Sequence, residues 1–350
     1  MKTGRTLQEL AIEIERQSTN KRDFIVDTCE HLTMLTTSDG SELHIAGSGE
    51  FGLHPLAHEH IADYLDIPRK FYGRLREGHP ALLDHNVNAL LRHESNRRMV
   101  RTLDGQVRAF LSDRYRRLDN DELAEAILPV LGEIPDVQFP STEITETRLY
   151  IKAVAPRVTG EVRKGDFVQA AVVITNSEVG MGALLVQPLV YRLVCTNGMI
   201  AGTASRRYHV GRQVDSTDAM GVYRDETLRA DDRAFWLKVR DVVRASVEET
   251  RFRAIVERMR LSAETAPMAD PNRGVEELGR RFHLGEQEQV SVLRHLTLGG
   301  DLTQYGALNA VTRASQDVQD YDRATDLEAI GGAILAMDGR EWRTVAEAAR

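Results

Sequence analysis

Arginine and aromatic side chains alternate in two stretches whose chemistry suits single-stranded nucleic acid. The first is "FLSDRYRRLDN" (110–120), and the second is "ASRRYHVGR" (204–212). A guanidinium group holds a phosphate and an aromatic ring stacks on a base, so such interleaving favours a single strand. The alternative is that these arginines form salt bridges with the acidic N-terminal part. The candidate ligands here are Phe110, Arg114, Tyr115, Arg116, Arg117, Arg206 and Arg207.

Two further candidate arginines lie in the segment "NRRMVRTLDGQVRAFLS" (96–112). Asp104-Gly105 stands between two alternating runs, which predicts a hairpin with a type I′ turn. Counting outward from a two-residue loop places Arg101 opposite Arg108, on the face away from the core. Like charges directly opposite each other destabilise a sheet, so a bound anion would relieve them. The hairpin therefore predicts that Arg101 and Arg108 bind phosphate.

The segment "YRLVCTNGMI" (191–200) raises the question of a cysteine nucleophile. A reactive thiolate needs a base or a positive environment, which His209 would supply only if the chain folds back. Asn-Gly is a strong turn signal, which favours a small buried cysteine at the end of a strand. We interpret Cys195, Thr196, Asn197 and Gly198 as a structural motif. Arg192 joins the predicted binding groove if this turn comes near it.

Other signs of chemistry are weak. His54, His58 and His60 form a possible metal motif, in which His54 and His58 would share one face of a helix. No cysteine nearby completes a tetrahedral metal site. No phosphate-binding loop, dinucleotide fingerprint or nucleophile elbow is present. The sequence therefore predicts no metal, no cofactor and no nucleotide hydrolysis, and the chain is not expected to be an enzyme. An enzyme that uses Cys195 or the histidines is the alternative.

The elements that must position these residues change character along the chain. Alternating strand patterns and short helices extend to about residue 220, and charged amphipathic helices follow. We expect an α+β fold, with a twisted, mainly antiparallel sheet and hairpins in a core domain (1–220), followed by a helical C-terminal domain (221–350). Within the first part, "HIADYLDIPRKFYGRL" has the spacing of a helix-turn-helix, with Asp66 in place of the usual turn glycine.

The composition sets outer limits on the function. The chain has 350 residues, a net charge of −8 and two cysteines. Two cysteines cannot form a disulfide framework, and no apolar run is long enough to span a membrane, so we expect a cytoplasmic protein. The acidic total argues against a non-specific DNA coat but leaves room for a local basic groove.

Several motifs taken together resemble the phage/plasmid-like family, a domain of unknown function (DUF932). The resemblance rests on "LVYRLVCTNGMI", "HIADYLDIPRKFYGRL", "FLSDRYRRLDN" and "GALNAVTRASQDVQDYDRATDLEAIGGAIL", and it covers about residues 45–335. It implies a setting in phages, plasmids and integrated elements. It implies no established activity and no thiol chemistry at the Cys-Thr-Asn-Gly turn.

These observations together predict a homo-oligomer that binds single-stranded DNA, with annealing in recombination as the expected use. Mobile elements commonly carry annealing proteins that hydrolyse no nucleotide, so the setting fits the residues. Two rival interpretations are a helix-turn-helix regulator that reads duplex DNA and a protein-interaction module that acts against host defence.

Overall fold

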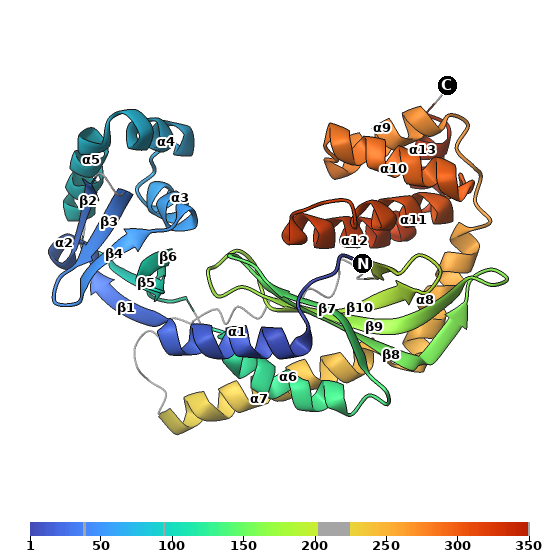
Figure 1. Cartoon of the computed structure of the whole chain (residues 1–350), viewed down its shortest axis with the longest axis horizontal. Helices are drawn as coiled ribbons and strands as arrows, with labels where there is room; N and C mark the ends of the chain where they lie inside the picture. The colour runs from blue at the N-terminus through green and yellow to red at the C-terminus, as the bar shows by residue number, and fades with distance from the viewer. Residues whose placement is uncertain (38–39, 94, 116, 202–224, 349–350) are drawn as a thin grey trace.

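The computed structural model describes residues 1–37, 40–93, 95–115, 117–201 and 225–348, with the backbone alone for residues 225–229 and 232. The fold is α+β, as predicted, but it contains two sheets in two lobes instead of one sheet (Figure 1). No helix among the described residues is long and apolar enough to cross a membrane.

The N-terminal lobe is built on a six-stranded sheet with the order β1-β5-β6-β4-β3-β2. Its neighbours are antiparallel except for β4 and β6, which run parallel. Three helices pack on one face around Leu43, Ile61 and Val100, and α5 also closes the β2 edge through Asn88. The elements are β1 (Arg22–Asp27), α2 (Thr28–His31), β2 (Leu32–Thr37), β3 (Gly40–Ile45), β4 (Gly49–Leu53), α3 (Pro55–Tyr64), α4 (Arg69–Gly78), α5 (Pro80–His93), β5 (Arg97–Leu103) and β6 (Gln106–Ser112).

The C-terminal lobe contains a five-stranded antiparallel sheet with the order β11-β10-β9-β8-β7, covered by helices on both faces (Figure 1). Its strands are β7 (Gln138–Ile144), β8 (Leu149–Glu161), β9 (Phe167–Asn176), β10 (Leu185–Arg192) and β11 (Asn197–Ile200). One face packs against α1 (Leu7–Asn20), α6 (Asn120–Gly132) and α7 (Asp225–Ser246). The other packs against α8 (Glu249–Ser262), α9 (Pro271–Phe282), α10 (Glu286–Gly299), α11 (Gln304–Ala314), α12 (Tyr321–Ala336) and α13 (Gly339–Ala346).

The boundary predicted at residue 220 does not fall between two hydrophobic cores. Helix α7 buries Phe235 and Val243 against one face of the β7–β11 sheet, and α8 to α13 share a core with its other face. The helices after residue 221 therefore cover apolar strand residues that precede it. Whether residues 1–220 fold alone stays a prediction.

The β5–β6 hairpin has the predicted turn but a different register. Asp104 and Gly105 both have positive φ angles, 51° and 78°, as a type I′ turn requires. A bulge then separates Thr102, which faces Val107, from Arg101, which faces Ala109. The prediction that Arg101 lies opposite Arg108 is therefore wrong, because the extra residue Arg108 shifts the pairing by one beyond the turn.

Candidate nucleic-acid interface

Arg101 is fully buried between the two lobes. Its guanidinium donates to both carboxylate oxygens of Asp23, at 2.8 and 3.1 Å, and to Asp119 at 2.6 Å. A fourth hydrogen bond, of 2.8 Å, goes to the backbone carbonyl of Glu178. No face of the side chain remains for a phosphate, so the assignment of Arg101 as a nucleic-acid ligand is corrected. Burial without these carboxylates would leave an unpaired charge at a cost of several kcal/mol.

Arg108 belongs to the same charge cluster. It forms an ion pair with Glu178, whose side chain is 4% exposed in the loop between β9 and β10. The other oxygen of Glu178 accepts from the backbone N–H of Asn120 at 2.7 Å, at the start of α6. A carboxylate is stabilised at a helix N-terminus, so Glu178 ties the hairpin of one lobe to a helix of the other. We call Lys21, Asp23, Arg101, Arg108, Asp119 and Glu178 the interlobe cluster.

The two aromatic residues that were predicted to stack on bases, Phe110 and Tyr115, already make contacts within the protein. Phe110 is 2% exposed and packs in the N-terminal core, where it contacts Tyr64, so its assignment as a base-stacking residue is corrected. Tyr115 donates its hydroxyl to the carbonyl of Ser177 at 3.0 Å, and burial raises its pKa. The hydroxyl of Tyr115 therefore helps to hold the start of the β9–β10 loop.

Arg192 lies far from the hairpin, at the end of β10. It makes a bidentate salt bridge with Asp166, at 2.6 and 2.7 Å, and the same carboxylate accepts the Tyr305 hydroxyl at 2.7 Å. This network joins the sheet to α11. Arg192 is therefore placed as a structural ion pair, away from the predicted groove.

The Cys-Thr-Asn-Gly motif is a docking element, but its turn precedes the predicted position. Residues 193–196 form the turn, and Asn197 and Gly198 belong to β11. Cys195 is only partly buried, whereas Leu193 and Val194 are exposed. The turn ends at Thr196, just before the Asn197-Gly198 pair that the sequence indicated as the turn. Thr196, with a φ of 50°, takes the left-handed conformation expected of a turn asparagine or glycine.

Two segments that are distant in the sequence meet at this turn. The carbonyl of Cys195 accepts from Arg313 at 2.8 Å, and Asn197 donates to Thr312 at 2.5 Å. A Cβ on Gly332 would lie 1.9 Å from the carbonyl of Ile200, so the glycine allows α12 to touch β11. The motif at 191–200 and the motif at 306–335 are therefore two halves of one contact.

The remaining predicted residues divide into three groups. Arg114 is exposed without an ion-pair partner among the described residues, whereas Arg117 is exposed but contacts Asp23 at 3.1 Å. Arg116, Arg206 and Arg207 lie outside the residues that the structure describes. Arg114 is thus the described candidate that stays available to an anion.

The histidines of the candidate metal motif point to different partners. His54 caps α3, and His58 is buried with Nδ1 2.9 Å from the Tyr72 hydroxyl. Burial lowers the pKa of His58 to about 4, so it is neutral near pH 7. His60 lies 3.3 Å from the backbone N–H of Phe110. Within the described residues, no group of three potential ligands converges.

Sequence reasoning missed a set of cations on the outer surface of the N-terminal lobe. Lys70, Arg74 and Arg76 on α4 are exposed, and no described carboxylate forms an ion pair with them. Arg74 lies over the ring of Phe71, with 5.2 Å between the guanidinium carbon and the ring centroid, and that ring is 39% exposed. The signal was present in the run "RKFYGRLR", which has four basic residues and no acid.

A second group of cations lies at the open end of the β5–β6 hairpin. Arg97 is exposed, and Arg98 lies opposite Ser112, two residues before Arg114. The Arg98 guanidinium stacks 4.4 Å from the Tyr64 ring, and burial lowers its pKa. Tyr64 ends α3, the helix that precedes α4. We use the name basic surface for the two groups together, which are Lys70, Phe71, Arg74 and Arg76 on α4, and Arg97, the half-buried Arg98 and Arg114 at the open end of the hairpin.

Comparison with known proteins identifies a family of unknown function. Residues 109–333 match the sequence profile of a family described as a domain of unknown function (DUF932). The match includes the Cys-Thr-Asn-Gly turn and its docking helices but begins after α4. No curated protein and no solved structure matches the chain.

Proposed function

The chain belongs to the family described as a domain of unknown function (DUF932), and for it we propose single-stranded DNA binding by the basic surface. The observation that carries the proposal is the set of exposed cations without carboxylate partners on α4 and at the hairpin's open end. Clustered cations that no carboxylate neutralises create a local positive potential, which favours an anionic ligand.

Phe71 favours a single strand over a duplex. Its ring is partly exposed beside Lys70 and Arg74, so a base could stack on it while the two cations hold the flanking phosphates. In a duplex the faces of the bases are covered by their neighbours, and an exposed ring gains less. We propose phosphate contacts on Lys70, Arg74 and Arg76, and a second set of contacts on Arg97 and Arg114 at the open end of the hairpin.

The wider proposal is strand annealing in recombination by an assembly of several copies, within phages, plasmids or integrated elements. An annealing protein needs to hold a strand and to present its bases, and neither step requires nucleotide hydrolysis. The sequence has no phosphate-binding loop, which agrees with this scheme.

Duplex reading by α3 and α4 is the second candidate. Asp66, with a φ of 54°, makes the left-handed turn between the helices, and the N–H of Ile67 closes it on the carbonyl of Ala62 at 2.9 Å. A helix pair with such a turn and a basic second helix can enter a major groove. The preference between single strand and duplex separates the two candidates.

The test compares fluorescence anisotropy of labelled single-stranded and double-stranded oligonucleotides over a range of salt. A triple Lys70→Gln, Arg74→Gln, Arg76→Gln variant should bind the single strand more weakly. Because each phosphate contact to a single strand contributes about −0.7 to the slope of log affinity against log salt, the slope should become shallower by roughly 2.

The matched control changes three exposed, unpaired cations of the other lobe, Lys164, Arg273 and Arg340, to glutamine. It removes the same net charge, so it should leave the slope unchanged. Equal losses in both variants would mean a non-specific charge effect. Tighter binding to duplex would favour the helix pair, and no binding to either would overturn both candidates in favour of a protein partner.

A further inference from the structure

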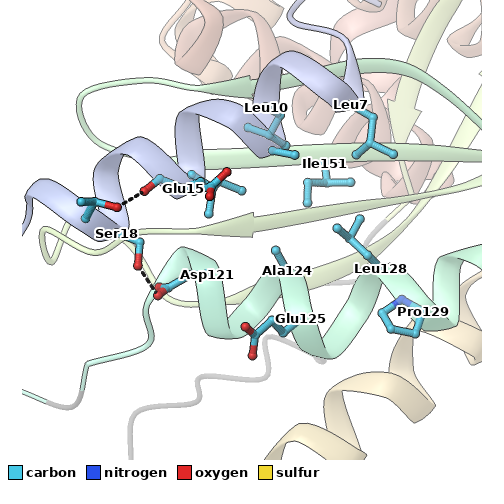
Figure 2. A pocket seen from close by; sticks show the side chains of 13 residues that line it. Leu7, Leu10, Glu15, Ser18, Asp121, Ala124, Glu125, Leu128, Pro129 and Ile151 are labelled. Atoms are coloured by element: carbon cyan, nitrogen blue, oxygen red, sulfur yellow. Dashed lines mark hydrogen bonds between the residues drawn. The ribbon is translucent and has the colours of Figure 1, made fainter.

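A groove runs between α1 and α6 on the underside of the C-terminal lobe. Its volume is about 480 Å³, and Leu10, Ile14, Leu128 and Ile151 line it (Figure 2). The lining is mostly apolar, because α1 and α6 leave part of the β8 surface between them. A hydrogen bond of 2.7 Å from Ser18 to Asp121 joins the two helices at one end.

Carboxylates stand along the rim of this groove. Glu15 on α1 and Glu125 on α6 are exposed, and no described cation forms an ion pair with either. Asp121, by contrast, already accepts from Lys21 at 2.8 Å. The groove therefore suits an occupant with an apolar ridge and positive charge beside it.

Helix α10 carries such a ridge on the opposite side of the sheet. Val290 and Leu298 are 69% and 78% exposed, and Arg294 lies between them at a spacing of four residues. Residues four apart share a helix face, so the three side chains form one line about 12 Å long. The α1 wall of the groove, from Leu7 to Ser18, is about 16 Å long by the same rise.

We propose that the Val290–Arg294–Leu298 ridge of one copy docks in the α1–α6 groove of the next. The ridge supplies two apolar side chains to the groove, and Arg294 faces the unpaired rim carboxylates. Arg294 now donates to Asp317 at 2.7 Å, but that carboxylate also accepts from Ser291. Asp317 therefore keeps a hydrogen-bond partner when Arg294 turns to the rim.

The position of the two surfaces determines the kind of assembly. The groove lies among helices on one face of the β7–β11 sheet, and α10 lies among those on the other (Figure 1). One copy thus cannot fill its own groove. A contact between different surfaces of two copies is head-to-tail and produces a ring or an open filament. This inference deepens the assembly part of the proposed function and does not depend on the nucleic-acid part.

The experiment uses sedimentation velocity of the full chain without nucleic acid. The wild type should form concentration-dependent oligomers. Leu298→Arg should prevent the ridge from docking. Ala11→Arg, at an exposed position of the groove wall, should prevent the groove from accepting a ridge. Each variant alone should therefore be monomeric. An equimolar mixture should then form a dimer that grows no further, because each variant keeps one intact surface.

Leu261→Arg is the matched control, since Leu261 is an exposed leucine (57%) on α8, outside the ridge. It should assemble like the wild type. Val290→Arg provides a second ridge variant if Leu298→Arg is poorly folded by circular dichroism. A monomeric wild type, unchanged assembly of the blocked variants, or a mixture that stays monomeric would each overturn the proposal. Loss of DNA binding with assembly intact would instead count against the basic surface.

Discussion

The β5–β6 hairpin carries two groups of arginines with opposite surroundings. Near the bulge, Arg101 is buried and Arg108 is partly buried, and both pair with carboxylates that come from β1, the start of α6 and the β9–β10 loop. Arg97 and Arg114, at the open end, are exposed and form no ion pair within the described part of the chain, although Asp27 of β1 lies opposite Arg97. The comparison shows that the role of each arginine in this hairpin depends on which acidic residues, distant in the sequence, the fold places beside it.

The largest expected effect comes from Arg101→Gln. This change removes the fully buried guanidinium and leaves the partly buried Asp23 and Asp119 without their main partner, so the free energy of unfolding should fall by about 3–5 kcal/mol. Urea denaturation followed by circular dichroism measures it. A loss below 1 kcal/mol would contradict the view that the interlobe cluster holds the two lobes together.

Glu178→Gln should have a smaller effect, because it keeps the shape and one acceptor but removes the charge that faces Arg108. We expect a loss of about 1–3 kcal/mol. Since Glu178 joins the lobes, calorimetry should also show a broader transition, with the N-terminal lobe unfolding first. A single sharp transition at the wild-type temperature would show that the lobes are coupled by other contacts.

Acid should weaken the interlobe cluster before it affects the basic surface. Burial by itself would raise the pKa of Asp119, but the charge and hydrogen bond of Arg101, together with Lys21, lower it below its ordinary value of 3.8. The unfolded state then binds the proton first, so this stabilisation is complete above about pH 5 and is lost as the pH falls further. The free energy of unfolding at pH 6, 4 and 3 should show the loss. Arg101→Gln should flatten this pH dependence, and an equally steep curve in that variant would assign it to other acids.

The smallest expected effect on stability belongs to the double variant Arg97→Gln, Arg114→Gln. Both side chains are exposed and unpaired, so the free energy of unfolding should change by less than about 0.5 kcal/mol. The same variant should make the salt slope of single-strand binding shallower by roughly 1.4. If stability falls and the slope stays the same, these arginines are structural like Arg101, and the comparison between the two groups fails.

Local patterns predicted some features well because neighbouring residues suffice to determine them. Asp104-Gly105 specifies its own turn, since both residues tolerate positive φ. The register beyond the turn was not predictable, because the bulge at Arg108 adds a residue that no pattern announces. Similarly, Asn-Gly indicated a turn near residue 197, but the hairpin closes one residue pair earlier, where β11 pairs with β10.

The candidate site shows the same limit more strongly. The sequence marked Arg101 and Arg108 through the predicted hairpin register and Arg114 through its aromatic neighbours. It singled out the α4 segment for its helix-turn-helix spacing and not for its basic residues. Arg101 meets Asp23 and Asp119 because two strands and a helix end converge on it, over separations of 78 and 18 residues. No spacing rule gives such a contact without the fold.

The sequence by itself determined the α+β class, the family motifs and the type of the hairpin turn, because each depends on periodicity or on the backbone preferences of adjacent residues. Only the tertiary structure decided which charges are neutralised, since a carboxylate pairs with whichever cation the packing places within a few ångströms. For that reason Glu178, in the loop between β9 and β10, forms an ion pair with Arg108, which is 70 residues away in the sequence. Lys70 and Arg74, on a short surface helix, are exposed to solvent.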